Sequence, residues 1–122
     1  MDQKKTVLIV EDNPDIANIT ARILQKSYDV HTASSASIAL EKLEQNHVDF
    51  ILMDLFLGAG DTGIELTRKL REIPKYKHLP IIAHTANAMS GHRVEAIDAG
   101  MNDYIAKPYR IKDLEAMVAR WI

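Results

Sequence analysis

The chain has 122 residues, a net charge of −2, 47% hydrophobic residues, 26% charged residues and no cysteine. This length fits one domain with a single core, and the composition is that of a folded globular protein rather than a disordered segment. The weakly acidic sequence lacks the concentrated basic face that nucleic-acid binding needs, and it contains no apolar run long enough to cross a membrane. We therefore expect one cytoplasmic domain over residues 1–122, with no nucleic-acid or membrane partner.

The first half of the chain alternates between strand-like and helix-like patterns. Residues 6–10 form a continuous apolar run, which predicts a buried strand, and Pro14 suits the first turn of the helix that follows. That helix carries an apolar stripe at helical spacing, made of Ile16, Ile19, Ile23 and Leu24. Residues 29–33 predict a second strand, a stripe within residues 36–43 predicts a second helix, and residues 48–53 predict a third strand.

The second half of the chain continues the alternation. A third helix is expected before Pro74, with an apolar stripe made of Leu66, Leu70 and Ile73. Residues 80–84 predict a fourth strand, and residues 90–99 predict a fourth helix that is followed by Gly100, a residue typical of helix C-termini. Residues 104–106 predict the last strand. A final stripe predicts the last helix and consists of Leu114, Met117, Val118 and Trp121.

Five strands that alternate with helices predict a parallel sheet, because each chain crossover returns the next strand in the same direction. The expected class is α/β, with a doubly wound five-stranded parallel sheet in the middle of a three-layer sandwich. Ligands bind to such sheets beyond the carboxyl ends of the strands. The polar residues that follow the strands are therefore the candidates for a functional site.

Charged or hydroxyl side chains stand at four of the expected strand ends. Glu11 and Asp12 follow the first strand, Asp54 follows the third, Thr85 the fourth and Lys107 the fifth. Carboxylates that lie close together repel one another and recruit a cation, and an all-oxygen ligand set favours Mg²⁺. A carboxylate can also act as a nucleophile toward a phosphoryl group, which an ammonium and a hydroxyl would stabilise. The set predicts phosphoryl-transfer chemistry that uses magnesium.

Each of these residues also has a purely structural interpretation. Glu11, Asp12 and Asp54 could cap the helices that follow their strands, and Thr85 could be an ordinary strand-end hydroxyl. The occurrence of three carboxylates and one ammonium at neighbouring strand ends favours a shared functional site over separate structural roles.

The five histidines show no metal-ligand spacing, and alternation along the strand should point His84 away from the side of Thr85. A group of cations predicts a solvated surface near the end of the third helix: Arg68, Lys69, Arg71, Lys75 and Lys77.

Four short motifs contain these strand-end residues: Val7-Leu8-Ile9-Val10-Glu11-Asp12-Asn13, Leu52-Met53-Asp54-Leu55, Thr85-Ala86 and Asp103-Tyr104-Ile105-Ala106-Lys107-Pro108. In this order and spacing they closely resemble the receiver domains of bacterial two-component response regulators. The resemblance covers the whole chain. It implies a flavodoxin-like (βα)5 fold with strand order 2-1-3-4-5. It also implies a signalling module that is not an enzyme for external substrates and that changes only its own phosphorylation.

The resemblance assigns roles to the carboxylates. It implies that Asp54 accepts a phosphoryl group from a phosphohistidine on a histidine kinase or a histidine phosphotransfer protein. It implies that Asp12 and Asp54 bind Mg²⁺, with Glu11 acting mainly through a water molecule. The backbone carbonyl of Phe56 would be a further magnesium ligand.

The resemblance also implies a switch. Thr85 would move toward the phosphoryl group, and Tyr104 would turn into the space that Thr85 leaves. The surface of the fourth helix, fifth strand and fifth helix would then change and control the binding of a downstream protein. Lys107 would offset the added negative charge, and the peptide bond between Lys107 and Pro108 is expected to be cis.

The loop after Asp54 departs from the usual receiver pattern. Gly58 stands where a proline is usual, and the glycine before the third helix, Gly63, comes one residue late. We interpret this as a one-residue insertion in a loop that its glycines make more mobile. Phe56 is bulkier and more apolar than is usual at its position, and we expect it to slow the attack of water on the phosphorylated carboxylate.

Other functions stay open on the sequence alone. An aspartyl-phosphate hydrolase would use a similar nucleophile, but it usually has a second aspartate where this chain has Phe56. A flavin or nucleotide binder would need a phosphate-cradling loop where Glu11 and Asp12 stand. A degenerate receiver that only docks proteins is the main alternative. A stand-alone receiver and a receiver of a hybrid kinase are not distinguished by these residues.

Overall fold

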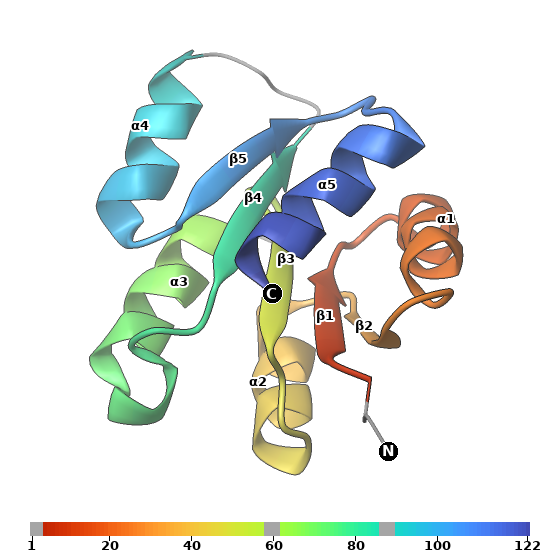
Figure 1. Ribbon diagram of the computed structural model, residues 1–122. Helices are drawn as coiled ribbons and strands as arrows, with labels where there is room; N and C mark the ends of the chain where they lie inside the picture. The colour runs from red at the N-terminus through yellow and green to blue at the C-terminus, as the bar shows by residue number, and fades with distance from the viewer. Residues whose placement is uncertain (1–3, 58–61, 86–89) are drawn as a thin grey trace.

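The computed structural model describes residues 4–57, 62–85 and 90–122, and strands and helices alternate along them (Figure 1). In chain order the elements are β1 (Thr6–Val10), α1 (Pro14–Leu24), β2 (Asp29–Ala33), α2 (Ala36–Gln45), β3 (Phe50–Asp54), α3 (Gly63–Glu72), the 3₁₀ turn η1 (Pro74–Tyr76), β4 (Ile81–Thr85), α4 (Ser90–Ala99), β5 (Asp103–Ala106) and α5 (Ile111–Trp121). The strands form one sheet in the order β2-β1-β3-β4-β5, and every neighbouring pair is parallel. The predicted α/β class and strand order are confirmed.

Helices cover both faces of the sheet, and each face has its own hydrophobic core. Alternate residues of β1 and β3 point to opposite faces, as the twofold repeat of a strand requires. Leu8 and Ile51 pack with α2, α3 and α4 on one face, whereas Val7 and Leu52 pack with α1 and α5 on the other (Figure 1). Because β1 and β3 lie inside the sheet, their side chains are buried on both faces, which explains their continuously apolar sequences.

The strand boundaries differ from the predicted ones at β3, β4 and β5. Strand β3 starts at Phe50 rather than at residue 48, and β4 starts at Ile81 rather than at residue 80, while β5 starts one residue early at Asp103. Strands β3 and β4 also run one residue further than predicted, to Asp54 and Thr85, because the register of the ladders continues to these residues. Both polar residues are therefore held by the sheet itself.

Some surface and core assignments from the sequence are wrong. Ile19 is 61% exposed on α1, and Ile73 is 39% exposed just after the end of α3, although both belong to predicted apolar stripes. Arg71 is not part of a solvated surface. Its guanidinium donates hydrogen bonds to the carbonyl oxygens of Gly100 and Tyr76, at 2.9 and 2.8 Å, and so ties the end of α3 to the end of α4.

Gly63 lets α3 start directly against the end of β3. Its N–H donates to the carbonyl oxygen of Leu55 at 2.9 Å, and the side chain of Thr62 caps the helix by accepting from the N–H of Glu65. A Cβ atom at position 63 would lie 2.1 Å from the carbonyl oxygen of Asp54, well inside contact distance. The glycine before the third helix is thus required by the close approach of two backbones.

Substituting Gly63→Ala should destabilise the fold, although alanine is normally the better helix former. The backbone of Asp54 or of the first turn of α3 has to move, and we expect a loss of about 1–3 kcal/mol in the free energy of unfolding. Denaturant unfolding of Gly63→Ala beside the exposed control Glu65→Ala on the same helix measures this. Equal stabilities of the two variants would show that the contact is unimportant.

Candidate functional site

Three carboxylates from two neighbouring strands lie together at the carboxyl ends of the sheet. Glu11 and Asp12 follow β1, Asp54 is the last residue of β3, and one oxygen from each lies within 4.8 Å of the others. Glu11 and Asp54 are buried, with 3% and 7% exposure, while Asp12 is exposed to solvent. Two of the three carboxylates are therefore shielded from solvent, and the third lies at the mouth of the site.

These carboxylates are not the caps of the following helices. The N-cap of α1 is Asn13, whose side chain accepts hydrogen bonds from the first turn, and the N-cap of α3 is Thr62. Glu11 accepts a hydrogen bond of 3.2 Å from the N–H of Asn13 through one carboxylate oxygen. Since other residues satisfy the helix ends, the structural interpretation of Asp12 and Asp54 loses its basis.

Lys107 bridges two of the carboxylates. Its ammonium donates to Oε1 of Glu11 and to Oδ2 of Asp54, the latter at 3.2 Å. Burial lowers the pKa of Lys107, but the hydrogen bond to Glu11 and the charges of Asp54 and Glu11 outweigh it, so the pKa lies above its usual value. The lysine is therefore a permanent cation in the site, and its pairing offsets the cost of burying these charges.

The residues with predicted switch roles lie on adjacent strands. Thr85 ends β4 with 2% exposure, and its backbone carbonyl accepts the N–H of Lys107 at 2.8 Å. Tyr104 on β5 is paired with Ala83, two residues before Thr85, so both side chains are on the same face of the sheet. Burial raises the pKa of Tyr104, and the positive charge of Arg93 on α4 partly opposes this.

Phe56 lies at the mouth of the site. Its N–H is 3.4 Å from Oδ1 of Asp54, its backbone forms a bridge with Thr62, and its side chain is 49% exposed. The ring meets His92 of α4 edge to face, with 5.3 Å between the ring centroids. A bulky apolar side chain thus stands beside the acceptor candidate, while the role of the Phe56 carbonyl as a metal ligand stays a prediction.

Two further expectations and one motif residue concern the loops around the site. The peptide bond between Lys107 and Pro108 is cis, as expected. The loop that starts with Gly58, with its inferred insertion, falls on residues 58–61, outside the described residues. Ala86, which follows Thr85 in its motif, also lies outside them.

His84 is a buried polar residue that the sequence patterns did not single out as part of the core. It alternates with Thr85 and is fully buried, with Nε2 at 3.5 Å from the carbonyl oxygen of Val10. Within the described part of the chain, its Nδ1 has no hydrogen-bond partner. Burial and the charge of nearby Lys107 lower the pKa of His84 to about 3, although the hydrogen bond to the Val10 carbonyl acts weakly in the opposite direction. The imidazole is therefore neutral beneath the site.

Thr20 and Tyr109 were also missed. Their hydroxyl groups are 2.8 Å apart and join α1 to the segment that follows Lys107. No periodicity or motif in the sequence marks either residue, because their contact joins positions that are 89 residues apart.

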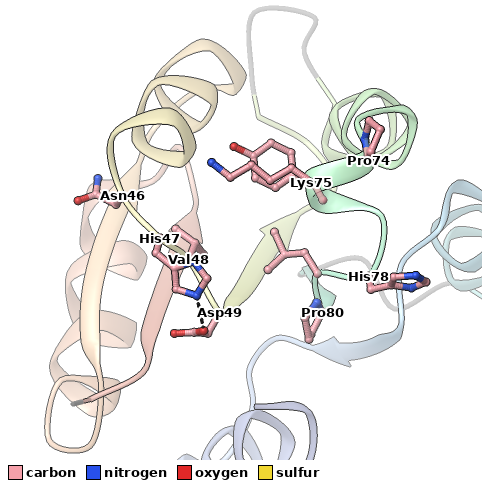
Figure 2. Close-up of a pocket in the computed structure, with 10 residues that line it drawn as sticks. Asn46, His47, Val48, Asp49, Pro74, Lys75, His78 and Pro80 are labelled. Carbon is pink, nitrogen blue, oxygen red and sulfur yellow. Dashed lines mark hydrogen bonds and ion pairs between the residues drawn. The ribbon is translucent and has the colours of Figure 1, made fainter.

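A separate pocket of about 310 Å³ lies at the other end of the sheet (Figure 2). It is lined by residues that precede β3 and β4, such as Val48 and Pro80, whereas the carboxylates of the site end or follow strands. Its one carboxylate, Asp49, is bonded to His47 at 2.9 Å through one oxygen and to the N–H of Thr6 through the other. The group of three carboxylates with a lysine therefore lies at the carboxyl ends of the strands and not in this pocket.

Comparison with known proteins identifies the family. The model of the response regulator receiver domain matches residues 7–119. The chain belongs to this family. A receiver domain is a phosphoacceptor module of two-component signalling systems, and the family binds Mg²⁺ at an acidic pocket such as the one that Glu11, Asp12 and Asp54 form here. In the described ranges, no helix has the length and apolar character needed to span a bilayer.

Two solved structures and one curated relative show the extent of the similarity. The receiver domain of the sensor histidine kinase PA1611 from Pseudomonas aeruginosa PAO1, with a magnesium ion in its active site cleft, is 36% identical, with a TM-score of 0.88 and 98% coverage of both chains. The chemotaxis protein CheY4 of Vibrio cholerae is 26% identical, with a TM-score of 0.92, and the match covers 98% of this receiver domain and 100% of that chain. Hybrid signal transduction histidine kinase M of Dictyostelium discoideum is 39% identical over 107 residues, which are 84% of this receiver domain but 4% of that protein.

Replacing His84 with leucine should remove a pH dependence of stability. The folded pKa of about 3 lies below the usual value of 6.5, so between these values the unfolded state takes up a proton that the folded state does not. As the pH falls from 7 to 5, we expect the free energy of unfolding to drop by about 2 kcal/mol through His84 alone.

Denaturant titrations at the two pH values measure this drop in the parent and in two variants. The control His78→Gln, which changes an exposed histidine, should behave like the parent. His84→Leu should lose about 2 kcal/mol less than the parent over the same interval. An equal pH effect in all three proteins would contradict a neutral buried His84.

Proposed function

We propose that residues 1–122 form a single receiver domain that accepts a phosphoryl group on Asp54 from a phosphohistidine. The donor would be a histidine kinase or a histidine phosphotransfer protein, and the domain would act in the cytoplasm, as receiver domains generally do. The observation that carries this proposal is the bridge from Lys107 to Glu11 and Asp54 beside a group of three carboxylates. Asp54 is the carboxylate of this set that the central strand holds.

The donor set fits Mg²⁺. Three carboxylate oxygens within 4.8 Å form a compact, all-oxygen set with excess negative charge, which suits a small hard cation. Asp12 and Asp54 would hold the ion, together with the backbone carbonyl of Phe56, while Glu11 would act mainly through a water molecule. When bound, the ion supplies positive charge that neutralises the carboxylates and the transferring oxygens.

The transfer step needs a nucleophile in line with the leaving group. An Oδ atom of Asp54 attacks phosphorus, and the new O–P bond forms as the P–N bond to the donor imidazole breaks. The electron pair of that bond stays on the imidazole nitrogen, and the product is an aspartyl phosphate. Lys107 already touches Asp54, so its ammonium is placed to pair with a phosphoryl oxygen and offset the added charge.

The negative charge of the phosphoryl group would also drive the conformational switch. Thr85 would donate its hydroxyl hydrogen to a phosphoryl oxygen, and Tyr104, on the same face of the sheet, would turn into the space that Thr85 leaves. The surface of α4, β5 and α5 would then change for a downstream protein. Val94 and Ile97 of α4 support such a surface, because these apolar side chains are 60% and 44% exposed.

The main alternative is a degenerate receiver that only docks other proteins. Such a domain has no need for a partly buried lysine held between two buried carboxylates, because removing these charges from water is costly. The described residues favour a phosphate acceptor for that reason. We also propose that the domain turns over no external substrate, since Phe56 occupies the position where a hydrolase would carry its general acid.

Substituting Asp54→Asn should abolish phosphorylation. With Mg²⁺ and acetyl phosphate, the parent should gain one phosphoryl group that is stable in acid and labile in base, as an acyl phosphate is. The matched control Asp98→Asn, which changes an exposed carboxylate of α4, should label like the parent. Equal labelling of Asp54→Asn and the parent would contradict the proposal. A parent that takes up no label would support the alternative of a degenerate receiver that only docks proteins.

Substituting Phe56→Asn should shorten the lifetime of the phosphorylated state. Removing the bulky ring opens the acceptor to water, and we expect the aspartyl phosphate to decay about tenfold faster, equivalent to about 1.4 kcal/mol of activation free energy. The control Phe56→Leu keeps an apolar side chain and should change the decay much less. Decay followed after removal of the donor decides this, and an unchanged rate in Phe56→Asn would rule out shielding by the ring.

A further inference from the structure

A partly buried hydrogen bond joins helix α1 to the segment that carries the site lysine. The hydroxyl groups of Thr20 and Tyr109 are 2.8 Å apart, although the residues are 89 positions apart in the chain. Thr20 is 1% exposed, and Tyr109 is partly buried against the core between the sheet and the helices α1 and α5. The buried hydroxyl of Thr20 has this partner only while α1 and the segment after β5 stay together.

Lys107 lies two residues before this bond. On its N-terminal side, the sheet holds Lys107 through its N–H, which donates to the carbonyl oxygen of Thr85 at 2.8 Å. On its C-terminal side comes Pro108, which has no N–H to donate, and the N-cap of α5, Arg110, makes no side-chain capping bond. The hydroxyl of Tyr109 therefore ties down the chain between the end of the sheet and the start of α5.

The hydroxyl of Tyr109 also lies in the electric field of the site. Burial raises the pKa of Tyr109, the bond to Thr20 and the charge of Lys107 lower it, and the charge of Glu11 raises it. Lys107, Tyr109 and Thr20 line the same groove of about 400 Å³ between α1 and the start of α5. Tyr109 is thus close enough to Lys107 to feel its charge, and Thr20 bonds the Tyr109 hydroxyl.

We propose that Thr20 and Tyr109 are positioning residues that keep the Lys107 ammonium on Glu11 and Asp54. A lysine side chain has four flexible bonds, so its charge is placed only as well as its backbone is held. The bond between Tyr109 and Thr20 holds that backbone against α1. This inference rests on the proposed role of Lys107 as the cation that meets the phosphoryl group.

The test measures the binding of beryllofluoride, a mimic of the phosphoryl group, separately from the binding of Mg²⁺. Beryllofluoride would meet Lys107, whereas Mg²⁺ would be held by the carboxylates, so loss of positioning should weaken the first and spare the second. Tyr109→Phe and Thr20→Val each remove one hydroxyl while keeping the shape of the side chain. We expect each to raise the beryllofluoride Kd about fivefold, the size of a typical buried hydrogen bond, with the Mg²⁺ Kd unchanged.

Three further variants complete the design. The double variant should be no weaker than either single variant, because both substitutions remove the same bond. Thr20→Ser keeps the hydroxyl and should restore parental binding. Tyr28→Phe removes another partly buried tyrosine hydroxyl against the same core and should have no effect. Effects that multiply in the double variant, or an equal loss of Mg²⁺ binding, would overturn the proposal and indicate general damage to the fold.

A second measurement does not depend on phosphoryl chemistry. In the parent without phosphate, NMR of the lysine side chains should show one ordered ammonium, that of Lys107, and the order should be lost in Tyr109→Phe and Thr20→Val. Persistence of the ordered ammonium in both variants would overturn the positioning role. If the order is lost as expected but the parent does not bind beryllofluoride, the positioning stands and the phosphoacceptor function fails.

Discussion

The site depends on one ion-pair network, in which the partly buried ammonium of Lys107 is shared by the buried carboxylates of Glu11 and Asp54. Charges removed from water are stable only when they are paired, so the ends of β1, β3 and β5 have to meet with little freedom. A parallel sheet with β3 next to β1 makes that possible, because all of its strands end at the same edge. The strand order is therefore the means by which three distant sequence segments supply one cation and its two carboxylate partners.

Two residues around the network have opposite consequences for stability. A neutral, fully buried His84 lies beneath the site with one ring nitrogen that has no partner among the described residues. Gly63 removes the side chain that would collide with the backbone of Asp54. An apolar residue at position 84 would avoid the cost of burying a polar ring, whereas an alanine at position 63 would collide with the end of β3, so only the glycine serves stability.

The sequence was sufficient to predict the fold class, the order of elements and the residues that the strand ends bring together. Alternating periodicity predicts such elements because it reflects which side is buried, and the carboxyl-end rule then locates Glu11, Asp54 and Lys107. Prediction from the sequence failed for side chains whose burial or hydrogen bonding depends on contacts between distant segments. Ile19 belongs to a helical stripe that is wider than the face α1 buries, and the bond between Thr20 and Tyr109 depends on a contact between distant segments.

Asp54, and no other carboxylate, is the proposed carrier of the phosphoryl group. Borohydride reduction converts an aspartyl phosphate to homoserine, and mass spectrometry of the digested protein then locates the modified residue. After incubation with Mg²⁺ and a phosphohistidine donor, we expect homoserine at position 54 alone. Homoserine at position 12, or intact aspartate at both positions in a protein that has taken up phosphate, would contradict the account.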